Sequence, residues 1–436
     1  MGGASRAAEL ATLAAARLEA AVALIDGATE QWLHDLARMI ATDTSFPPGA
    51  GYADFADLTE DLCAPLGFSC ERVVVPEHLW AASGSSGPRV NLIARRSTGP
   101  AKPVCSIYFH VDAVPAGEGW TRPSHALTRE GDRLYGRGTA DMKGTIAATL
   151  AALRAADEAG LALAFDPVLL FCTDEEGGLY PGVRYLAEQG RIEGHVMCLN
   201  GGAAPRIWAG CFGSLDISIN VEGRAAHSGD ARNGINAVEE ALPILSALLD
   251  LKKNVETRRS ALPPPPHHKD EPLRARLNVT AVHGGVKGSA LPGRCTILVN
   301  RRYAPEEPFD AVKTELERTV HRAAATTRAL SINTTIVGHL APVSDPDGGP
   351  HWARWQKALA YGFGFAPDSF RRWGASSSSD MGFVQQAGLR EILLGGLSRP
   401  EARTHAADEF TTIADVSGLA KSILAYLADV DIPLRQ

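Results

Sequence analysis

The chain has 436 residues, a net charge of −7 at pH 7 and an apolar fraction of 45%, as in an ordinary soluble globular protein long enough for two domains. It has no long basic run, so we expect no nucleic-acid partner, because phosphate binding requires clustered lysines and arginines. We also expect no membrane partner and a cytoplasmic location. No apolar run is long enough to span a bilayer, the alanine-rich N-terminal segment carries charges, and the cysteines lack disulfide spacing.

Helices and strands alternate through the first half of the chain. Apolar residues at three- and four-residue spacing predict helices, and runs rich in β-branched and aromatic residues predict strands. The predicted helices are 1–27, 29–45, 55–68, 142–160 and 182–190, and the predicted strands are 70–76, 89–96, 103–112, 165–174 and 193–202. This alternation implies a mostly parallel α/β sheet, in which ligands bind at the carboxyl ends of the strands.

The pattern changes after about Cys211. The following segment has strands 213–229, 275–285, 294–303 and 330–338, helices 234–255 and 309–327, and a proline-rich loop whose His267 and His268 we expect to be exposed. From about His339 the first pattern returns, with helices 351–364 and 413–430 and strand 390–396. The predicted fold class is α/β: residues 1–211 and 339–436 form a catalytic domain with a mostly parallel sheet, and residues 212–338 form an inserted, smaller α+β lid or dimerisation domain.

Acids and histidines gather at four predicted strand–loop junctions. These residues are His110 and Asp112; Asp141; Glu175 and Glu176; and His405, with Asp408 and Glu409 nearby. Imidazole and carboxylate groups from separate strand ends are the ligands of zinc and similar divalent ions, whose charge offsets the repulsion between neighbouring carboxylates. Because adjacent residues of an extended segment point apart, one of the two glutamates can bind a metal while the other faces the substrate as a base.

Each of these segments alone has an ordinary structural explanation. An HxD sequence on a strand is usually a surface pair, and a DEE segment is more often a solvated turn; the four segments together favour a metal site. We interpret "GASSSSDMG", which contains Ser377, as a binding loop. A catalytic serine would be indicated by a GxSxG elbow, which the sequence lacks.

A series of motifs resembles those of one family in the same order. They read "FHVDAVPAGEGW", "LYGRGTADMKG", "FCTDEEGG", "EGRAAHSGDARNGINAV", "LNVTAVHGG", "RRYAPEE" and "THAADEF". From about Gln31 to the C-terminus the chain resembles the M20 family of metal-dependent amidohydrolases and peptidases, which includes acetylornithine deacetylase, succinyl-diaminopimelate desuccinylase, the glutamate carboxypeptidases and aminoacylase. The resemblance implies a catalytic α/β domain with an inserted lid that often dimerises.

The resemblance also implies roles for individual residues. The implied metal ligands are His110, Asp141, Glu176 and His405, with Asp141 bridging two metals. Glu175 matches the general base, and Asp112 matches the acid that orients a metal-bound histidine. His227 matches a lid histidine that, in dimeric members, reaches the partner's active site and polarises the scissile carbonyl. Asp380 and Arg302 match polar positions near the closed site.

The chain departs from the family pattern at one implied ligand. The family usually has Asp or Glu where this sequence has Asn200, and a neutral amide oxygen is a poor zinc ligand. Asn200 is therefore a doubtful ligand, and we predict one tightly held divalent metal, Zn or Mn, with a second site that is weak or empty. Arg371, Arg372 and Arg403 flank the site loops; each could hold a substrate carboxylate or lie simply on the surface.

The sequence favours a metal-dependent hydrolase of a C–N bond, most simply the amide of a small N-acyl amino acid or dipeptide-like substrate, with Glu175 as general base. A first alternative is hydrolytic deamination of an activated aromatic amine, such as a nitroanthranilate, with release of ammonia. A second is a non-catalytic relative that binds a metal or ligand; the retained glutamate pair argues against it, because unused buried acids are costly. We expect a small-molecule substrate and a homodimer formed through the inserted domain.

Overall fold

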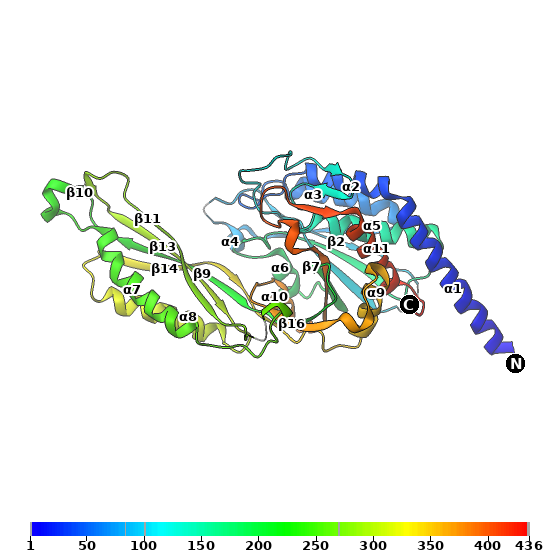
Figure 1. Cartoon of the computed structure of the whole chain (residues 1–436). Helices are drawn as coiled ribbons and strands as arrows, with labels where there is room; N and C mark the ends of the chain where they lie inside the picture. Colours follow the sequence, from blue (N-terminus) through cyan, green and yellow to red (C-terminus); the bar gives the residue numbers. More distant parts are fainter. Residues whose placement is uncertain (1, 83, 100–101, 269–270, 434–436) are drawn as a thin grey trace. The chain divides into compact units, whose positions relative to one another are not determined.

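The structure is a computed structural model that describes residues 2–82, 84–99, 102–268 and 271–433. The chain forms two compact units (Figure 1). The larger unit contains the segments up to Trp208, Pro346–Arg372 and from Phe383 onward. The smaller unit contains Ala209–Asp345 and Trp373–Gly382. Within the described residues, no helix is long and apolar enough to cross a membrane.

A six-stranded sheet in the order β1-β2-β6-β3-β7-β17 forms the centre of the larger unit. Its strands are β1 (Ser69–Val75), β2 (Arg89–Arg95), β3 (Val104–His110), β6 (Asp166–Cys172), β7 (His195–Gly202) and β17 (Ile392–Ser398). Strand β3 pairs in parallel with β6 and β7, and β17 pairs in parallel with β7, whereas β2 runs antiparallel to β1 and β6. The sheet is thus largely parallel, as the alternating pattern predicted.

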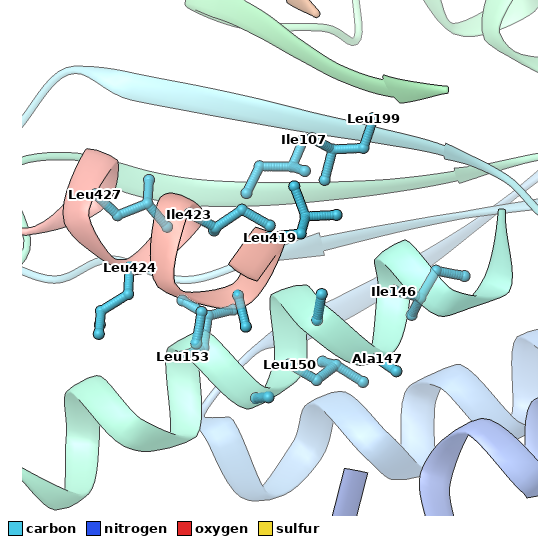
Figure 2. Packing of buried hydrophobic residues seen from close by; sticks show 14 of the residues in the cluster. Ile107, Ile146, Ala147, Leu150, Leu153, Leu199, Leu419, Ile423, Leu424 and Leu427 are labelled. Carbon is cyan, nitrogen blue, oxygen red and sulfur yellow. The ribbon is translucent and has the colours of Figure 1, made fainter. Parts of the chain in front are cut away.

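Helices cover this sheet and close its core. They are α1 (Gly2–Gly27), α2 (Thr29–Ala41), α3 (Tyr52–Cys63), α4 (Glu77–Trp80), α5 (Lys143–Glu158), α6 (Gly182–Glu188), α9 (Trp352–Phe363) and α11 (Ile413–Leu427). The short helix α10 (Met381–Gln386) contains the boundary between the smaller and the larger unit. Figure 2 shows aliphatic side chains of α5 and α11 gathered beside Ile107 of β3 and Leu199 of β7, all of them buried. This packing holds β3, β6 and β7 together, so their carboxyl ends meet at one edge of the sheet.

The smaller unit is an antiparallel sheet in the order β11-β13-β9-β14, with α7 and α8 packed on it (Figure 1). Its elements are β9 (Gly213–Glu222), α7 (Ala237–Val255), β11 (Arg276–Gly284), β13 (Arg294–Tyr303), α8 (Phe309–Ala324) and β14 (Ser331–Leu340). Alternate residues of β13 are buried, as one covered face requires. The alternating strand predicted over 213–229 ends earlier, at Glu222, and is followed by β10 (Ala226–His227), which pairs with β12 (Ala290–Leu291).

Two short sheets and one additional segment were not evident in the sequence pattern. The first sheet has the strand order β15-β8-β16 and consists of β8 (Arg206–Cys211), β15 (Val343–Ser344) and β16 (Arg371–Ala375). The second has the order β18-β5-β4 and consists of β4 (Thr128–Glu130), β5 (Arg133–Tyr135) and β18 (Phe410–Thr412). Residues 373–382 join the smaller unit, which extends beyond the 212–338 segment of the sequence analysis. Backbone bonds explain this: Phe212 N donates to Ala375 O at 3.1 Å, and Gly374 N to Pro263 O at 2.8 Å. His267 and His268 are exposed, as predicted.

Candidate metal centre

The carboxyl edge of the large sheet gathers four of the predicted ligands. Strand β3 ends at His110, which pairs with Cys172 at the end of β6, and Glu176 follows four residues after Cys172. Asp141 lies in the glycine-bounded loop that leads into α5. Ligand atoms of His110, Asp141 and Glu176 all lie within 4.8 Å of one another. The sheet topology therefore brings together residues that are far apart in the sequence.

Asp141 lies between two imidazoles. His110 Nε2 is 2.9 Å from Asp141 Oδ1, and His405 Nε2 is 3.2 Å from Asp141 Oδ2. His405 Nε2 is also 3.1 Å from Glu176 Oε2. The two carboxylate oxygens of Asp141 thus face different ligand groups, which is the geometry that a carboxylate shared by two metal positions would need.

A backbone contact sets the orientation of His110. Its Nδ1 lies 3.0 Å from the carbonyl oxygen of Asp112, so Nδ1–H donates there and Nε2 is directed at the acids. The resemblance assigned this orienting role to the Asp112 carboxylate, whose Oδ1 is 3.7 Å from Nδ1. The other carboxylate oxygen, Oδ2, accepts a hydrogen bond of 2.7 Å from Glu176 N. Asp112 therefore orients the histidine through its backbone and anchors the loop of the glutamates through its side chain.

The acids and imidazoles of this cluster fit a divalent cation. Burial lowers the pKa of His110, but the hydrogen bond and charge of Asp141 and the charge of Glu175 raise it well above its usual value. The hydrogen bonds to Asp141 and Glu176 raise the pKa of His405 to about 10. Among the described residues, Glu176 Oε1 is buried with no hydrogen-bond partner. A dication would bind this free oxygen and replace the imidazole protons as the balancing charge.

A second buried acid holds the Asp141 loop. Glu409 Oε1 accepts hydrogen bonds from Ala140 N at 3.0 Å and Asp141 N at 3.2 Å. Its other oxygen accepts a 2.6 Å bond from Arg137 Nη1, and both side chains are almost fully buried. In the sequence, Glu409 was evident only as a neighbour of His405. In the structure it holds the backbone that carries Asp141.

Glu175 and Asn200 lie beside the cluster. Glu175 is half-buried directly before Glu176, and its charge acts on His110. Asn200 lies near the end of β7, which pairs with β3 through Tyr108 and Cys198. The pairing ends there, and the same register continued by two residues along both strands would bring Asn200 opposite His110.

The three arginines that were considered as substrate ligands differ in their contacts. Arg372 forms a two-fold ion pair with Asp347, with bonds of 2.7 and 3.1 Å, so its guanidinium already has a carboxylate partner. Arg371 donates to backbone carbonyls. Arg403 is exposed, is 3.9 Å from Asp408 Oδ2, and precedes His405 by two residues. Arg403 is therefore the better candidate for a substrate carboxylate.

The remaining predicted residues belong to the smaller unit. Arg302 Nη1 donates to Ser378 Oγ at 2.6 Å, Asp380 is fully buried, and Ser377 is exposed. His227 is exposed, and its Nδ1 accepts a 3.1 Å hydrogen bond from Gly229 N. In the neutral ring this bond leaves the proton on Nε2, which makes Nε2 a hydrogen-bond donor.

The sequence analysis did not identify the groups that support the glutamate loop. Asp174 accepts hydrogen bonds from Arg89 Nε at 2.7 Å and from Tyr52 Oη at 2.8 Å, and all three side chains are buried. Asp174 is the aspartate of the DEE segment, for which the sequence indicated no separate role. No local signal marked Arg89, because it lies 85 residues earlier in the chain.

Comparison with known proteins identifies the family and the fold. The sequence profile of peptidase family M20/M25/M40 matches residues 106–429. The chain is 29% identical over 402 residues to succinyl-diaminopimelate desuccinylase of Paracidovorax citrulli, covering 88% of this chain and 93% of that protein. Its fold is similar to the di-peptidase Dug1p of Saccharomyces cerevisiae, with a TM-score of 0.78, 16% identity, and 94% and 97% of the two chains covered. Human carnosine dipeptidase 1 has a TM-score of 0.76, 17% identity, and coverage of 94% and 98%.

Proposed function

Because the chain belongs to peptidase family M20/M25/M40 and is a metal-dependent hydrolase of C–N bonds, we propose that it cleaves the amide of a small N-acyl amino acid or dipeptide-like substrate. The single observation that carries this proposal is the Glu175–Glu176 pair at the acid–imidazole cluster. Glu176 Oε2 lies 3.1 Å from His405 Nε2, and Glu175, whose charge acts on His110, is the acid that we assign to proton transfer. The names of similar proteins, a desuccinylase and two dipeptidases, support this substrate class.

The side chains divide the reaction between them. A bound divalent metal would supply Lewis acidity and make an attacking water more acidic. His110, Asp141, Glu176 and His405 would hold it. Glu175 takes the proton of the water and delivers it to the leaving nitrogen as the C–N bond breaks. His227 donates from Nε2 to the negative charge that develops on the carbonyl oxygen when the water adds to the carbonyl carbon. Arg403 could bind the carboxylate of an amino-acid substrate.

A substrate panel tests this function. Purified protein with added Zn, Mn or Co should release a free amine from at least one N-acyl amino acid or dipeptide, and a chelator should abolish the release until metal is restored. The matched control is the Glu175→Gln protein prepared in parallel. Ammonia release from an activated aminoarene, with no amide cleaved, would replace the proposal by hydrolytic deamination. Stoichiometric metal without turnover of either class would indicate a binding protein.

We also propose that the protein is a homodimer formed through the smaller unit. Strands β11 and β14 are the edges of its sheet, and edge strands tend to pair with another chain. Large apolar side chains are exposed on this unit: Leu242 and Leu249 on α7 are 57% and 51% exposed, and Val282 on β11 is 45% exposed. Such surface is typical of an interface. The dimer would allow His227 to act in the active site of the partner.

Mixing two inactive variants tests this role of His227. Each of His227→Ala and Glu175→Gln should lower kcat by about 100-fold or more, because one removes the oxyanion donor and the other the base. Subunits exchanged between the two proteins should regain about a quarter of wild-type activity, because half of the dimers are mixed and one of their two sites has both groups. No recovery despite subunit exchange, or a fully active monomer in sedimentation, would exclude action across the dimer.

A further inference from the structure

The loop of the two glutamates begins at a residue with an unusual backbone conformation. Asp174, directly after β6, has a φ of 62°, which is the left-handed region that residues other than glycine seldom adopt. The chain then folds back tightly, since a Cβ on Gly178 would lie 2.1 Å from the Cβ of Asp174. Gly177, with a φ of 137°, completes the turn. This conformation sets the direction in which Glu175 and Glu176 leave the strand.

A buried network holds the Asp174 side chain in this position. Arg89, the first residue of β2, donates from Nε to Asp174 Oδ2, and Tyr52 of α3 donates to Oδ1. Both side chains of the ion pair are at most 1% exposed. The carboxylate therefore has one defined partner on each oxygen, which leaves it little freedom to rotate.

Arg89 is itself held from every side. Its guanidinium carbon lies 4.1 Å from the ring centroid of Trp80, 5.3 Å from that of Tyr52 and 5.5 Å from that of Phe46. Its Nη1 donates to the carbonyls of Ser86 and Gly87, and its Nη2 to that of Pro48. A planar guanidinium can stack on aromatic rings and donate several hydrogen bonds within its plane at the same time, which an ammonium group cannot do.

The burial of this ion pair is not explained by stability alone. The free-energy cost of removing two charges from water is usually about as large as the free energy gained from their attraction. A pair of well-packed apolar residues would therefore stabilise the core at least as well. The pair instead fixes a residue with a strained backbone next to the cluster. A strained backbone conformation persists only where contacts with the surrounding residues leave it no alternative.

We infer that Arg89 is a positioning residue: by fixing Asp174, with Tyr52, it directs Glu175 and Glu176 to their separate tasks. The inference rests on the proposed function for the task of Glu175, whereas the position of Glu176 affects metal binding whether or not the substrate is an amide. Asp112, which bonds Glu176 N, holds the same loop from the side of β3. Two contacts from separate strands thus define the loop.

Variants of the pair test this role through metal affinity. Arg89→Met leaves Asp174 as an unpaired buried charge and can impair folding, so the double variant Arg89→Met/Asp174→Asn, which removes both charges, is measured beside it. Arg89→Lys keeps the charge without the planar donors, and Tyr52→Phe removes a single hydrogen bond. The control is Arg154→Met, because Arg154 on α5 forms a 2.5 Å pair with the buried Asp35, away from the loop.

We expect the folded double variant and Arg89→Lys to bind Zn about 10- to 100-fold more weakly in chelator competition and to lose kcat by at least about tenfold, with KM changed less than about threefold. Arg154→Met should lower the melting temperature with Zn affinity and kcat within about twofold of wild type. If the double variant behaves like Arg154→Met, the positioning role is excluded. Weaker Zn binding in a protein that cleaves no amide would leave this role standing and remove the proposed reaction instead.

Discussion

Replacing Glu175 by glutamine should lower kcat by about 100- to 10,000-fold while the metal content and melting temperature stay near those of wild type. Glutamine has the shape of glutamate but cannot accept the proton of the attacking water. Glu176, which is directed at Asp141 and His405, is untouched by this change. The loss should therefore appear in turnover and not in folding or metal binding.

The neighbouring substitution provides the contrast. Glu176→Gln should lose metal, because it removes an anionic oxygen from the group of ligands. Metal per subunit, kcat and melting temperature measured for both variants separate the two roles. A Glu175→Gln protein with more than about a tenth of wild-type kcat would show that another group transfers the proton, and equal metal loss in both variants would show that both glutamates bind metal.

The sequence was sufficient to predict that His110, Asp141, Glu176 and His405 lie close together. His110 and Glu176 follow strands that the apolar pattern identifies, and the carboxyl ends of parallel strands meet at one edge. The position of Asp141 at the site was predicted from its glycine-bounded loop, which precedes a helix. The position of His405 was predicted from the resemblance of its motif to the family motif. The spacing of apolar residues predicts where each strand ends, and the order of strands and helices predicts which strand ends lie together. These two features of the sequence therefore predict which residues meet at the edge of the sheet.

The groups that support the cluster could not be predicted in this way. Arg89 reaches Asp174 because β2 runs antiparallel to β6, a register that pairs Leu92 with Phe171 and, extended by three residues, Arg89 with Asp174. Nothing in the sequence near Arg89 indicates which strand lies beside β2. The membership of residues 373–382 in the smaller unit likewise depends on backbone bonds to Phe212 and Pro263, which lie more than 100 residues earlier in the chain.

Asn200 makes the two sides of Asp141 unequal. On the side of Oδ2 lie Glu176 and His405, so a metal there would have two carboxylates and an imidazole. On the side of Oδ1 lies His110, and the register of β7, continued past its last pair with β3, would add Asn200. A dication on this second side would have one imidazole, one shared carboxylate and a neutral amide oxygen, which binds zinc poorly.

We therefore propose one tightly bound metal, Zn or Mn, at Asp141, Glu176 and His405, with a second position that is weak or empty. One metal is sufficient for hydrolysis, because a single dication can lower the pKa of water to near neutrality. His110 would then serve as an additional ligand to the same metal or as a hydrogen-bond donor to the substrate. Because Nδ1–H donates to the Asp112 carbonyl, Nε2 of the neutral ring has a lone pair for a metal, whereas donation from Nε2 to a substrate would require the doubly protonated ring.

Changing Asn200 to aspartate should restore the second position. The added carboxylate attracts a dication and completes the ligands beside His110, so the affinity for the second metal should rise by about tenfold or more, while the first is unchanged. Elemental analysis after mild chelation should find one metal per subunit in the wild type and more than one in Asn200→Asp, with Asn200→Ser as a control of similar polarity without charge. Two metals that survive chelation in the wild type, or no gain in Asn200→Asp, would show that another group completes the second position and that the missing charge at residue 200 does not determine metal binding.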